Sequence, residues 1–236
     1  MTVELSIVIP VYNEGPNIEK TLRGIDAAVT TEPYEVLIVH DMDEDDTLPV
    51  VHRLQPGMPQ VRTVRNRERG VLAAMRTGFD QSEAPLVLVS MADGSDDPRD
   101  IDRMVELGRR GADVVAASRY MKGGRQVGGP PMNAAMSRGA GLALRWVGGL
   151  PIHDATSNFR LYSRRLLDRV TIESTAGFEL ALELTVKAHR MGMRVAEVPT
   201  TWRDRTAGES RFQLKKWLPH YLKWFGVGLT SRLARR

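Results

Sequence analysis

The chain has 236 residues, of which 42% are hydrophobic and 26% charged, and it contains no cysteine. This composition suits one globular domain, with or without an appendage, and it excludes a disordered chain, a disulfide-stabilised scaffold and any cysteine-based site. The longest uncharged apolar stretches span about nine residues, whereas a membrane-spanning helix needs about 20. The start, MTVELSIVIP, lacks the features of a signal peptide, so we expect a cytoplasmic protein.

Positive charge is concentrated near the C-terminus. The formal net charge is +4. Residues 201–236 hold nine Lys/Arg against two Asp/Glu, whereas residues 1–200 hold 24 against 27. Three of the four tryptophans also lie in residues 201–236. A basic, aromatic tail after a slightly acidic body indicates that the two parts meet different partners.

Short apolar runs alternate with helix-length segments through the first half of the chain. The continuous apolar runs predict strands that are buried on both faces, and they lie at residues 5–9, 35–39, 61–64, 86–90 and 113–117. The segments between them predict helices near residues 17–28, 48–54, 70–81 and 100–108. This alternation predicts an α/β fold in which a doubly wound, mostly parallel sheet occupies residues 1–120.

The pattern changes after Tyr120. The stretch MKGGRQVGGPPMN contains four glycines and two prolines, which predicts a mobile loop. Helices near residues 132–147 and 178–191 and a strand at 195–198 are expected to follow. We predict one domain over residues 1–213, with halves at 1–120 and 121–213, and a basic amphipathic tail over residues 214–236.

Polar side chains gather where the predicted strands end, in residues 12–14, 40–46, 91–97 and 118–120. In open α/β sheets, ligands bind beyond the carboxyl ends of the strands. Four of the acidic residues are expected to close turns or cap helices, namely Asp45, Asp46, Asp96 and Asp97. Carboxylates at the same edge of several strands nevertheless predict a binding crevice.

The composition of this edge indicates what it binds. The sequence has no G-x-G-x-x-G after the first strand and no G-x-x-x-x-G-K-[ST] anywhere, so the common backbone cradles for phosphate are absent. Carboxylates can hold a phosphate through a hard divalent cation that both groups ligate. The edge therefore favours a metal–diphosphate substrate such as a nucleotide sugar.

Five segments, in order over residues 5–213, resemble family-2 glycosyltransferases of the GT-A fold. They are IVIPVYNEGPNI, VHDMDEDDT, ASRYMKGG, HDATSNFRLYSRRLL, and GFELALEL with EVPTTWRDRTAGESRF. The last two are similar to segments of the dolichyl-phosphate mannosyltransferase-like branch. The resemblance implies inverting transfer of a sugar, mannose by default, from GDP-mannose or a UDP-hexose to a polyprenyl phosphate. Residues 1–120 are then the nucleotide-sugar-binding half and residues 121–213 the acceptor half.

The resemblance implies a donor site at the ends of the first two strands. Pro10, Tyr12 and Glu14 match the segment that holds the base and ribose. Asp41 matches a base-recognition carboxylate of the family, whose usual acidic neighbour is His40 in this chain.

The resemblance also implies a cation, either Mg²⁺ or Mn²⁺. Asp93 matches the last residue of the family's metal-binding D-x-D, whose first two positions are Met91 and Ala92 here. A thioether is a poor ligand for a hard cation. The cation would therefore depend on Asp93, the diphosphate, water, and Ser95 or Asp96, which implies weak metal affinity or a shifted ribose contact.

On the acceptor side, Arg119 and Ser137 match residues that hold the lipid phosphate. Asn133 stands where the family has a second arginine, and Arg125 or Arg138 could replace it.

Two later arginines, Arg205 and Arg211, match the R-x-x-G-x-S-K segment and could clamp the donor diphosphate or the acceptor phosphate. We expect catalysis to depend on Asp93, Arg119 and Arg205.

The acceptor's chemistry decides whether a base is required. A phosphate monoester is already an anionic nucleophile near neutral pH, so positioning and leaving-group stabilisation suffice. A hydroxyl acceptor would need a base, for which Asp154 and Glu179 are the candidates. Two alternatives therefore stay open: a soluble glycosyltransferase with a hydroxyl acceptor, and, because of Met91, a non-catalytic donor-binding subunit.

The tail contains apolar residues at helical spacing, namely Trp217, Leu218, Tyr221, Leu222 and Phe225, with basic residues elsewhere on the turn. This pattern predicts either a helix that lies on the inner face of a membrane or a helix that packs on its own domain or on a dimer mate. Pro219 is expected to start it. We expect no nucleic-acid partner.

Overall fold

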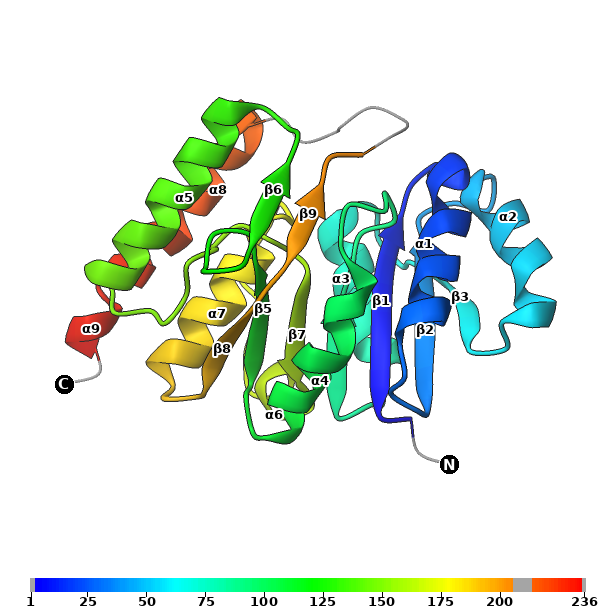
Figure 1. The fold of residues 1–236 in the computed structure, drawn as a ribbon, viewed down its shortest axis with the longest axis horizontal. Coiled ribbons are helices and arrows are strands. Elements are labelled where there is room, and N and C mark those ends of the chain that lie inside the picture. Colours follow the sequence, from blue (N-terminus) through cyan, green and yellow to red (C-terminus); the bar gives the residue numbers. More distant parts are fainter. Residues whose placement is uncertain (1–2, 206–213, 235–236) are drawn as a thin grey trace.

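Residues 3–205 and 214–234 are described by the computed structural model shown in Figure 1. The first half alternates strands with helices and short 3₁₀ turns, with the bounds β1 Leu5–Val11, α1 Gly15–Ala28, β2 Tyr34–His40, α2 Thr47–Leu54, η1 Gln55–Gly57, β3 Val61–Arg65, α3 Val71–Gln81, β4 Leu86–Val89, η2 Pro98–Asp100, α4 Ile101–Arg109 and β5 Val114–Ser118. The second half comprises β6 Arg125–Val127, α5 Pro131–Trp146, β7 Arg160–Ser163, α6 Arg164–Leu167, α7 Leu180–Arg190, β8 Val195–Pro199, β9 Thr201–Arg203, α8 Leu214–Leu229 and α9 Ser231–Ala234.

A seven-stranded sheet in the order β3-β2-β1-β4-β7-β5-β8 organises the molecule. All of its pairings are parallel except those of β7, which runs antiparallel between β4 and β5. The predicted doubly wound, mixed and mostly parallel sheet is thus confirmed, and the predicted strands and helices lie within a few residues of those observed.

Two apolar layers bury the sheet, as the continuous apolar runs predict. Because successive side chains of a strand point to opposite faces, Ile7 and Ile9 of β1 pack with α1, α2 and α4, whereas Val8 packs with α3 and α7. All seven residues of β1 are buried. The carboxyl ends of β1, β2, β4 and β5 consequently lie at one edge of a rigid sheet.

The segment predicted as a mobile loop contains ordered structure. Strand β6 lies within it and pairs in parallel with β9, from Arg125 opposite Thr201 to Val127 opposite Arg203. This two-stranded ribbon lies above the main sheet in Figure 1, between α5 and the ends of the central strands.

The C-terminal helix α8 packs on the domain, which is one of the two arrangements that its sequence predicts. Trp224 is 3% exposed and joins an apolar cluster with Leu144 of α5 and Val186 of α7. The Tyr221 hydroxyl donates a hydrogen bond of 2.8 Å to the Phe178 carbonyl, while Leu222 is exposed. The prediction that Pro219 starts the helix is wrong, since α8 begins at Leu214.

No helix within the described ranges is long and apolar enough to cross a membrane.

We predict that Trp224→Ala destabilises the whole domain. Loss of a buried tryptophan leaves a cavity between α5, α7 and α8 and should lower the free energy of unfolding by about 3–5 kcal/mol, measured by urea denaturation. The exposed Leu222→Ala change on the same helix is the control and should stay within about 0.5 kcal/mol of wild type. Equal stability of the two variants would show that α8 is not part of the core.

Candidate active site

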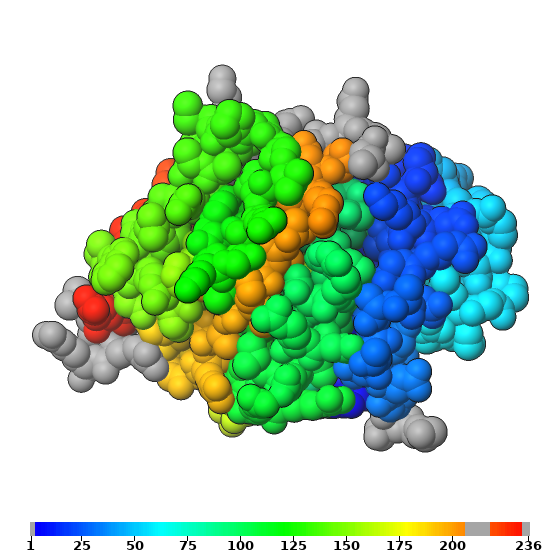
Figure 2. All heavy atoms as spheres, in the orientation of Figure 1, coloured from blue at the N-terminus to red at the C-terminus, as the bar shows by residue number. Residues whose placement is uncertain are grey.

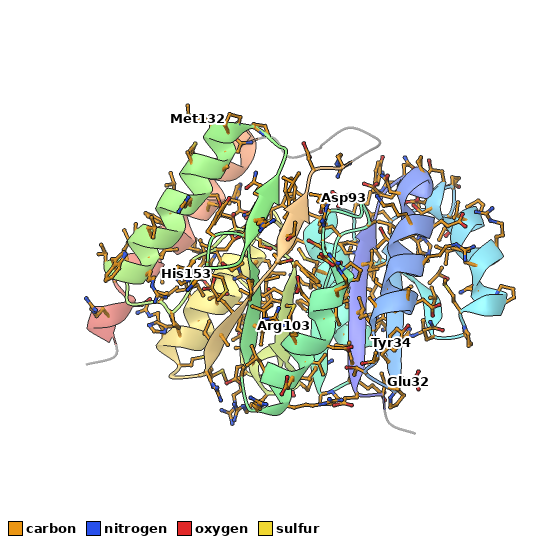
Figure 3. The ribbon with its side chains drawn as sticks, in the orientation of Figure 1. Glu32, Tyr34, Asp93, Arg103, Met132 and His153 are labelled. Carbon is orange, nitrogen blue, oxygen red and sulfur yellow. The ribbon has the colours of Figure 1, made fainter. Side chains whose placement is uncertain are left out.

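The loops after β1, β2, β4 and β5 lie at one edge of the sheet, where the sequence predicts a binding crevice. Figure 3 shows Asp93 at this edge of the sheet, with Glu32 and Tyr34 at the opposite edge. At the edge that carries Asp93, Pro10 is buried near the end of β1, whereas Tyr12 is exposed.

Several carboxylates of the edge close turns, as predicted. Asp45 accepts hydrogen bonds from the Asn13 and Thr47 amides, and Asp46 accepts one from the Gly15 amide. Asp97 likewise accepts a bond from the Arg99 amide at the start of η2. These residues are therefore structural, and they fix the loops that carry the remaining acids.

Asp41 ties the end of β2 to the loop after β3. Its carboxylate accepts a hydrogen bond of 2.7 Å from the Asn66 side chain and one of 2.8 Å from the Gly70 amide. The neighbouring His40 is buried, with Nδ1 3.0 Å from the Met42 carbonyl. The role of Asp41 in base recognition stays a prediction. Its carboxylate is oriented by the hydrogen bonds from Asn66 and Gly70.

Asp93 and Glu14 are brought together by Arg205, although Arg205 is 112 residues from Asp93. The Arg205 guanidinium lies 2.8 Å from the Asp93 carboxylate and 3.7 Å from that of Glu14. The Ser95 amide donates a further hydrogen bond of 3.0 Å to Asp93. The ends of β1 and β4 and the segment after β9 thus converge on one charged cluster, which we call the Asp93 cluster.

Asp96 follows Asp93 in the loop after β4, and its carboxylate points back toward Met91. Its carboxylate accepts hydrogen bonds from the Met91 amide (2.9 Å) and the Ser90 hydroxyl (3.0 Å). Burial, together with the nearby charge of Asp93, raises the pKa of Asp96 to about 7 against the opposing effect of these hydrogen bonds. Ala92 is buried, and its carbonyl accepts a hydrogen bond of 2.8 Å from the Thr21 hydroxyl.

The donor atoms around Asp93 fit a cation only in part. Hard cations such as Mg²⁺ take oxygen ligands, often one or two carboxylates together with substrate phosphates. Asp93 supplies one carboxylate, Met91 supplies a thioether, and Arg205 already neutralises Asp93. Within residues 3–205 and 214–234, no group of three or more His, Asp or Glu side chains is arranged to hold a metal. A cation would therefore depend on the donor's diphosphate for most of its ligands.

Arg119, at the end of β5, forms a buried ion pair with Asp154. Nε and Nη2 of Arg119 lie 2.7 and 2.9 Å from the two carboxylate oxygens, and the Arg119 amide also donates to Asp154. The Asp154 side chain is fully buried and that of Arg119 is 13% exposed. Burial alone would raise the pKa of Asp154, but the charge and hydrogen bonds of Arg119 outweigh it and hold the pKa below its usual value.

Hydroxyl and aromatic groups surround the Arg119 guanidinium. Nη2 donates to the hydroxyls of Ser137 (3.2 Å) and Thr156 (2.8 Å), and those two hydroxyls also bond to each other. The guanidinium carbon lies 4.8 Å from the ring centre of Tyr120 and 5.9 Å from that of Trp202. Arg119 and Ser137, which the sequence assigns to the same acceptor phosphate, are therefore in direct contact, and their binding of a phosphate stays a prediction.

The other predicted acceptor residues differ in position. Asn133 lies half-buried one turn before Ser137 on α5. Arg138 and Arg125 are exposed. Arg211 lies outside the described residues.

Two residues that sequence reasoning missed, each with a largely buried side chain, support the Arg119–Asp154 pair. Glu197 of β8 accepts hydrogen bonds from the amides of His153 (2.7 Å) and Asp154 (3.0 Å). Arg160 of β7 is fully buried and donates a hydrogen bond of 2.9 Å to the Asp154 carbonyl. The only signal for Arg160 in the sequence was its place at the end of HDATSNFR.

The two carboxylates considered as bases for a hydroxyl acceptor are both held by other groups. Asp154 is bound to Arg119, and Glu179 is buried and accepts hydrogen bonds from the amides of Thr175, Ala176 and Gly177. Neither carboxylate is poised to take a proton from a substrate.

Comparison with known proteins places this site in context. Residues 6–171 match the profile described as Glycosyl transferase family 2. The chain is 30% identical over 236 residues to the polyprenol monophosphomannose synthase of Mycolicibacterium smegmatis, covering 97% of this chain and 88% of that protein. It is also 30% identical over 234 residues to the dolichol-phosphate mannosyltransferase of Pyrococcus furiosus, covering 95% of this chain but only 65% of that relative's length.

Solved structures support the GT-A fold. A mannosyltransferase from Pyrobaculum calidifontis, in complex with GDP-Man and Mn²⁺, superposes with a TM-score of 0.66 at 18% identity, covering 100% of this chain and 71% of the other. Glucosyl-3-phosphoglycerate synthase from Mycobacterium tuberculosis, in complex with Mn²⁺, UDP and glucosyl-3-phosphoglycerate, superposes with a TM-score of 0.69 at 19% identity, covering 97% and 80%.

We predict that Asp96 makes the metal-free protein less stable as pH rises. Its pKa is about 7 in the folded protein and about 3.8 in the unfolded chain. Because the folded state holds the proton more tightly, the free energy of unfolding falls as the pH rises from about 3.8 to about 7. In EDTA, the Tm of Asp96→Asn minus that of wild type should therefore increase from pH 4 to pH 7 and then level off. The exposed Asp168→Asn change is the control. A Tm difference that is independent of pH would contradict the assignment.

Proposed function

Because the chain belongs to glycosyl transferase family 2, we propose that it transfers a sugar from a nucleoside diphosphate donor to a polyprenyl phosphate. The observation that carries the proposal is the preoriented Arg119. Asp154 engages Nε and Nη2, and among the described residues nothing bonds to Nη1. A guanidinium held in this way beside two hydroxyls suits recognition of a phosphate, whose oxygens match the planar donors of arginine.

The proposed reaction requires no base from the protein. A phosphate monoester carries a charge of about −1.5 to −2 at pH 7, so one of its oxygens can attack the anomeric carbon directly. The new bond joins this oxygen to the anomeric carbon with inversion, and the bond from that carbon to the nucleoside diphosphate breaks. The engagement of Asp154 and Glu179 in structural hydrogen bonds agrees with an acceptor that is already ionised.

The Asp93 cluster is the proposed site of the donor diphosphate. Asp93 would hold Mg²⁺ or Mn²⁺ together with the diphosphate oxygens, and the cation would stabilise the charge of the leaving nucleoside diphosphate. Arg205 would leave Asp93 and Glu14 to bind the same diphosphate. Pro10, Tyr12, Glu14 and Asp41 surround the proposed place of the nucleoside.

A product assay tests the proposal. Purified protein is incubated with GDP-mannose or with a UDP-hexose, a polyprenyl phosphate, and Mg²⁺, Mn²⁺ or EDTA, and mass spectrometry then identifies the glycolipid. We expect a polyprenyl-phosphate sugar, with GDP-mannose the first donor to examine because the relatives named above are mannosyltransferases. Donor binding without any product would instead favour a donor-binding subunit.

We predict that Arg119→Lys raises the acceptor KM by about tenfold or more while the Kd of the donor stays unchanged, because lysine keeps the charge but loses the planar fork. Alanine is a poorer choice at this position, since it leaves Asp154 as an unpaired buried charge at a cost of about 3–5 kcal/mol.

Steady-state kinetics and donor calorimetry measure the two quantities, with Arg169→Lys, at an exposed arginine after α6, as the matched control. An equal loss of donor affinity in Arg119→Lys would move Arg119 to the donor site.

We predict that Arg205→Ala has opposite effects on the cation and on the donor. Without the competing guanidinium, Asp93 should bind Mn²⁺ more tightly in the absence of donor, while the nucleotide sugar should bind more weakly. Calorimetric titrations measure both affinities, and Arg203→Ala, which removes a neighbouring exposed arginine, is the control. Mn²⁺ affinity that is the same in wild type, Arg205→Ala and Asp93→Ala would show that the cation does not bind Asp93.

A further inference from the structure

Helix α5 exposes an unusual number of large apolar side chains. Trp146 is 72% exposed and Met132 is 69% exposed, and Met136, Leu142 and Val147 are also exposed. In Figure 2, α5 forms the outer surface of the molecule at the left of the view, and Figure 3 shows Met132 at the end of α5 nearest the ribbon of β6 and β9. We call these five side chains the α5 outer face.

The α5 outer face is continuous. At 100° per residue, its five side chains fall within an arc of about 140° around the helix. Ala135 and Gly139, which lie inside the same arc, are exposed as well. Contiguous apolar surface of this kind is rare on monomeric proteins and marks a surface that contacts something else.

The opposite side of α5 belongs to the domain. Leu144 is buried against Trp224 and Val186, and Gly141 is buried as well. Ser137 also points inward and bonds to Arg119. A single helix therefore carries the proposed acceptor-phosphate contact on one side and an uncovered apolar surface on the other.

The charge around this face has one sign. Residues 121–153 contain four Lys/Arg and no Asp/Glu, and residues 214–234, whose helix α8 packs beside α5, also contain four Lys/Arg and no Asp/Glu. Arg138 and Arg145, about two turns apart on the same side of the helix, lie along one border of the apolar arc. An apolar helix face with cations along one border matches an interface between acyl chains and anionic headgroups.

We propose that the α5 outer face lies on the surface of an anionic lipid bilayer. The helix axis lies parallel to the membrane, with Trp146 and the methionines among the upper acyl chains and Arg138 and Arg145 at the headgroups. Ser137 and Arg119 then face the domain just above the bilayer, where a lipid-linked phosphate emerges. Membrane contact through α5 is independent of the proposed reaction, whereas delivery of the acceptor rests on it.

Vesicle binding tests the proposal with the full chain. Wild type should sediment with vesicles of mixed phosphatidylglycerol and phosphatidylcholine and bind more weakly to phosphatidylcholine alone. The double change Met132→Ser with Trp146→Ser should weaken binding by about tenfold or more, because each side chain loses its buried apolar area. Arg145→Glu should weaken binding to the anionic vesicles alone. Met191→Ser, at an exposed methionine after α7, is the control and should bind like wild type.

The activity assay separates this proposal from the proposed function. The double variant should keep wild-type turnover on a short, water-soluble prenyl phosphate and lose turnover on a long-chain acceptor in vesicles. Absence of wild-type binding to anionic vesicles, or equal binding by the double variant, would overturn the membrane surface, as would a dimer in light scattering that the double change dissociates. Turnover on the short acceptor in any of those cases would leave the proposed reaction standing.

Discussion

The buried ion pair between Arg119 and Asp154 is the interaction on which the proposed acceptor side depends. A buried charge is costly unless it is paired and hydrogen-bonded, and here the two charges pair and hydrogen-bond with each other. Asp154 receives Nε and Nη2 of Arg119, while its backbone is held by Glu197 and Arg160. Strands β5, β7 and β8 and helix α5 therefore meet at one point. Their convergence fixes the guanidinium before any ligand binds, which lowers the entropic cost of recognising a phosphate.

The two halves of the site are built differently. On the proposed acceptor side, Arg119 is held in place by a buried partner, Asp154. On the donor side, Arg205 neutralises Asp93 and Glu14, two carboxylates that the donor and its cation would need. A donor diphosphate bound at this proposed site would therefore exchange one charge pair for another at the Asp93 cluster. The departure at Met91 makes this exchange more important, because it leaves Asp93 without a second carboxylate on the same turn.

Continuous apolar runs predicted the parallel part of the sheet, and family motifs singled out both Arg119 and Ser137, because both kinds of signal are local in sequence. The missed features depend on distant contacts. Strand β7 is a four-residue antiparallel insertion whose neighbours, β4 and β5, precede it by more than 40 residues. The Arg205–Asp93 contact joins residues 112 apart. The apolar face predicted for α8 did not include Trp224, although the domain buries this side chain. The α5 outer face, with its exposed apolar side chains, was not predicted.

The most direct test of the account compares two acceptors that differ in one group. A short prenyl chain is supplied either as the phosphate or as the free alcohol, with the same donor and cation, and kcat/KM is measured for each. We predict transfer to the phosphate and none above background to the alcohol, because we propose that Arg119 binds the anionic acceptor and because Asp154 and Glu179 are both held by other groups. Comparable transfer to the alcohol, with the phosphate giving no advantage, would contradict the account.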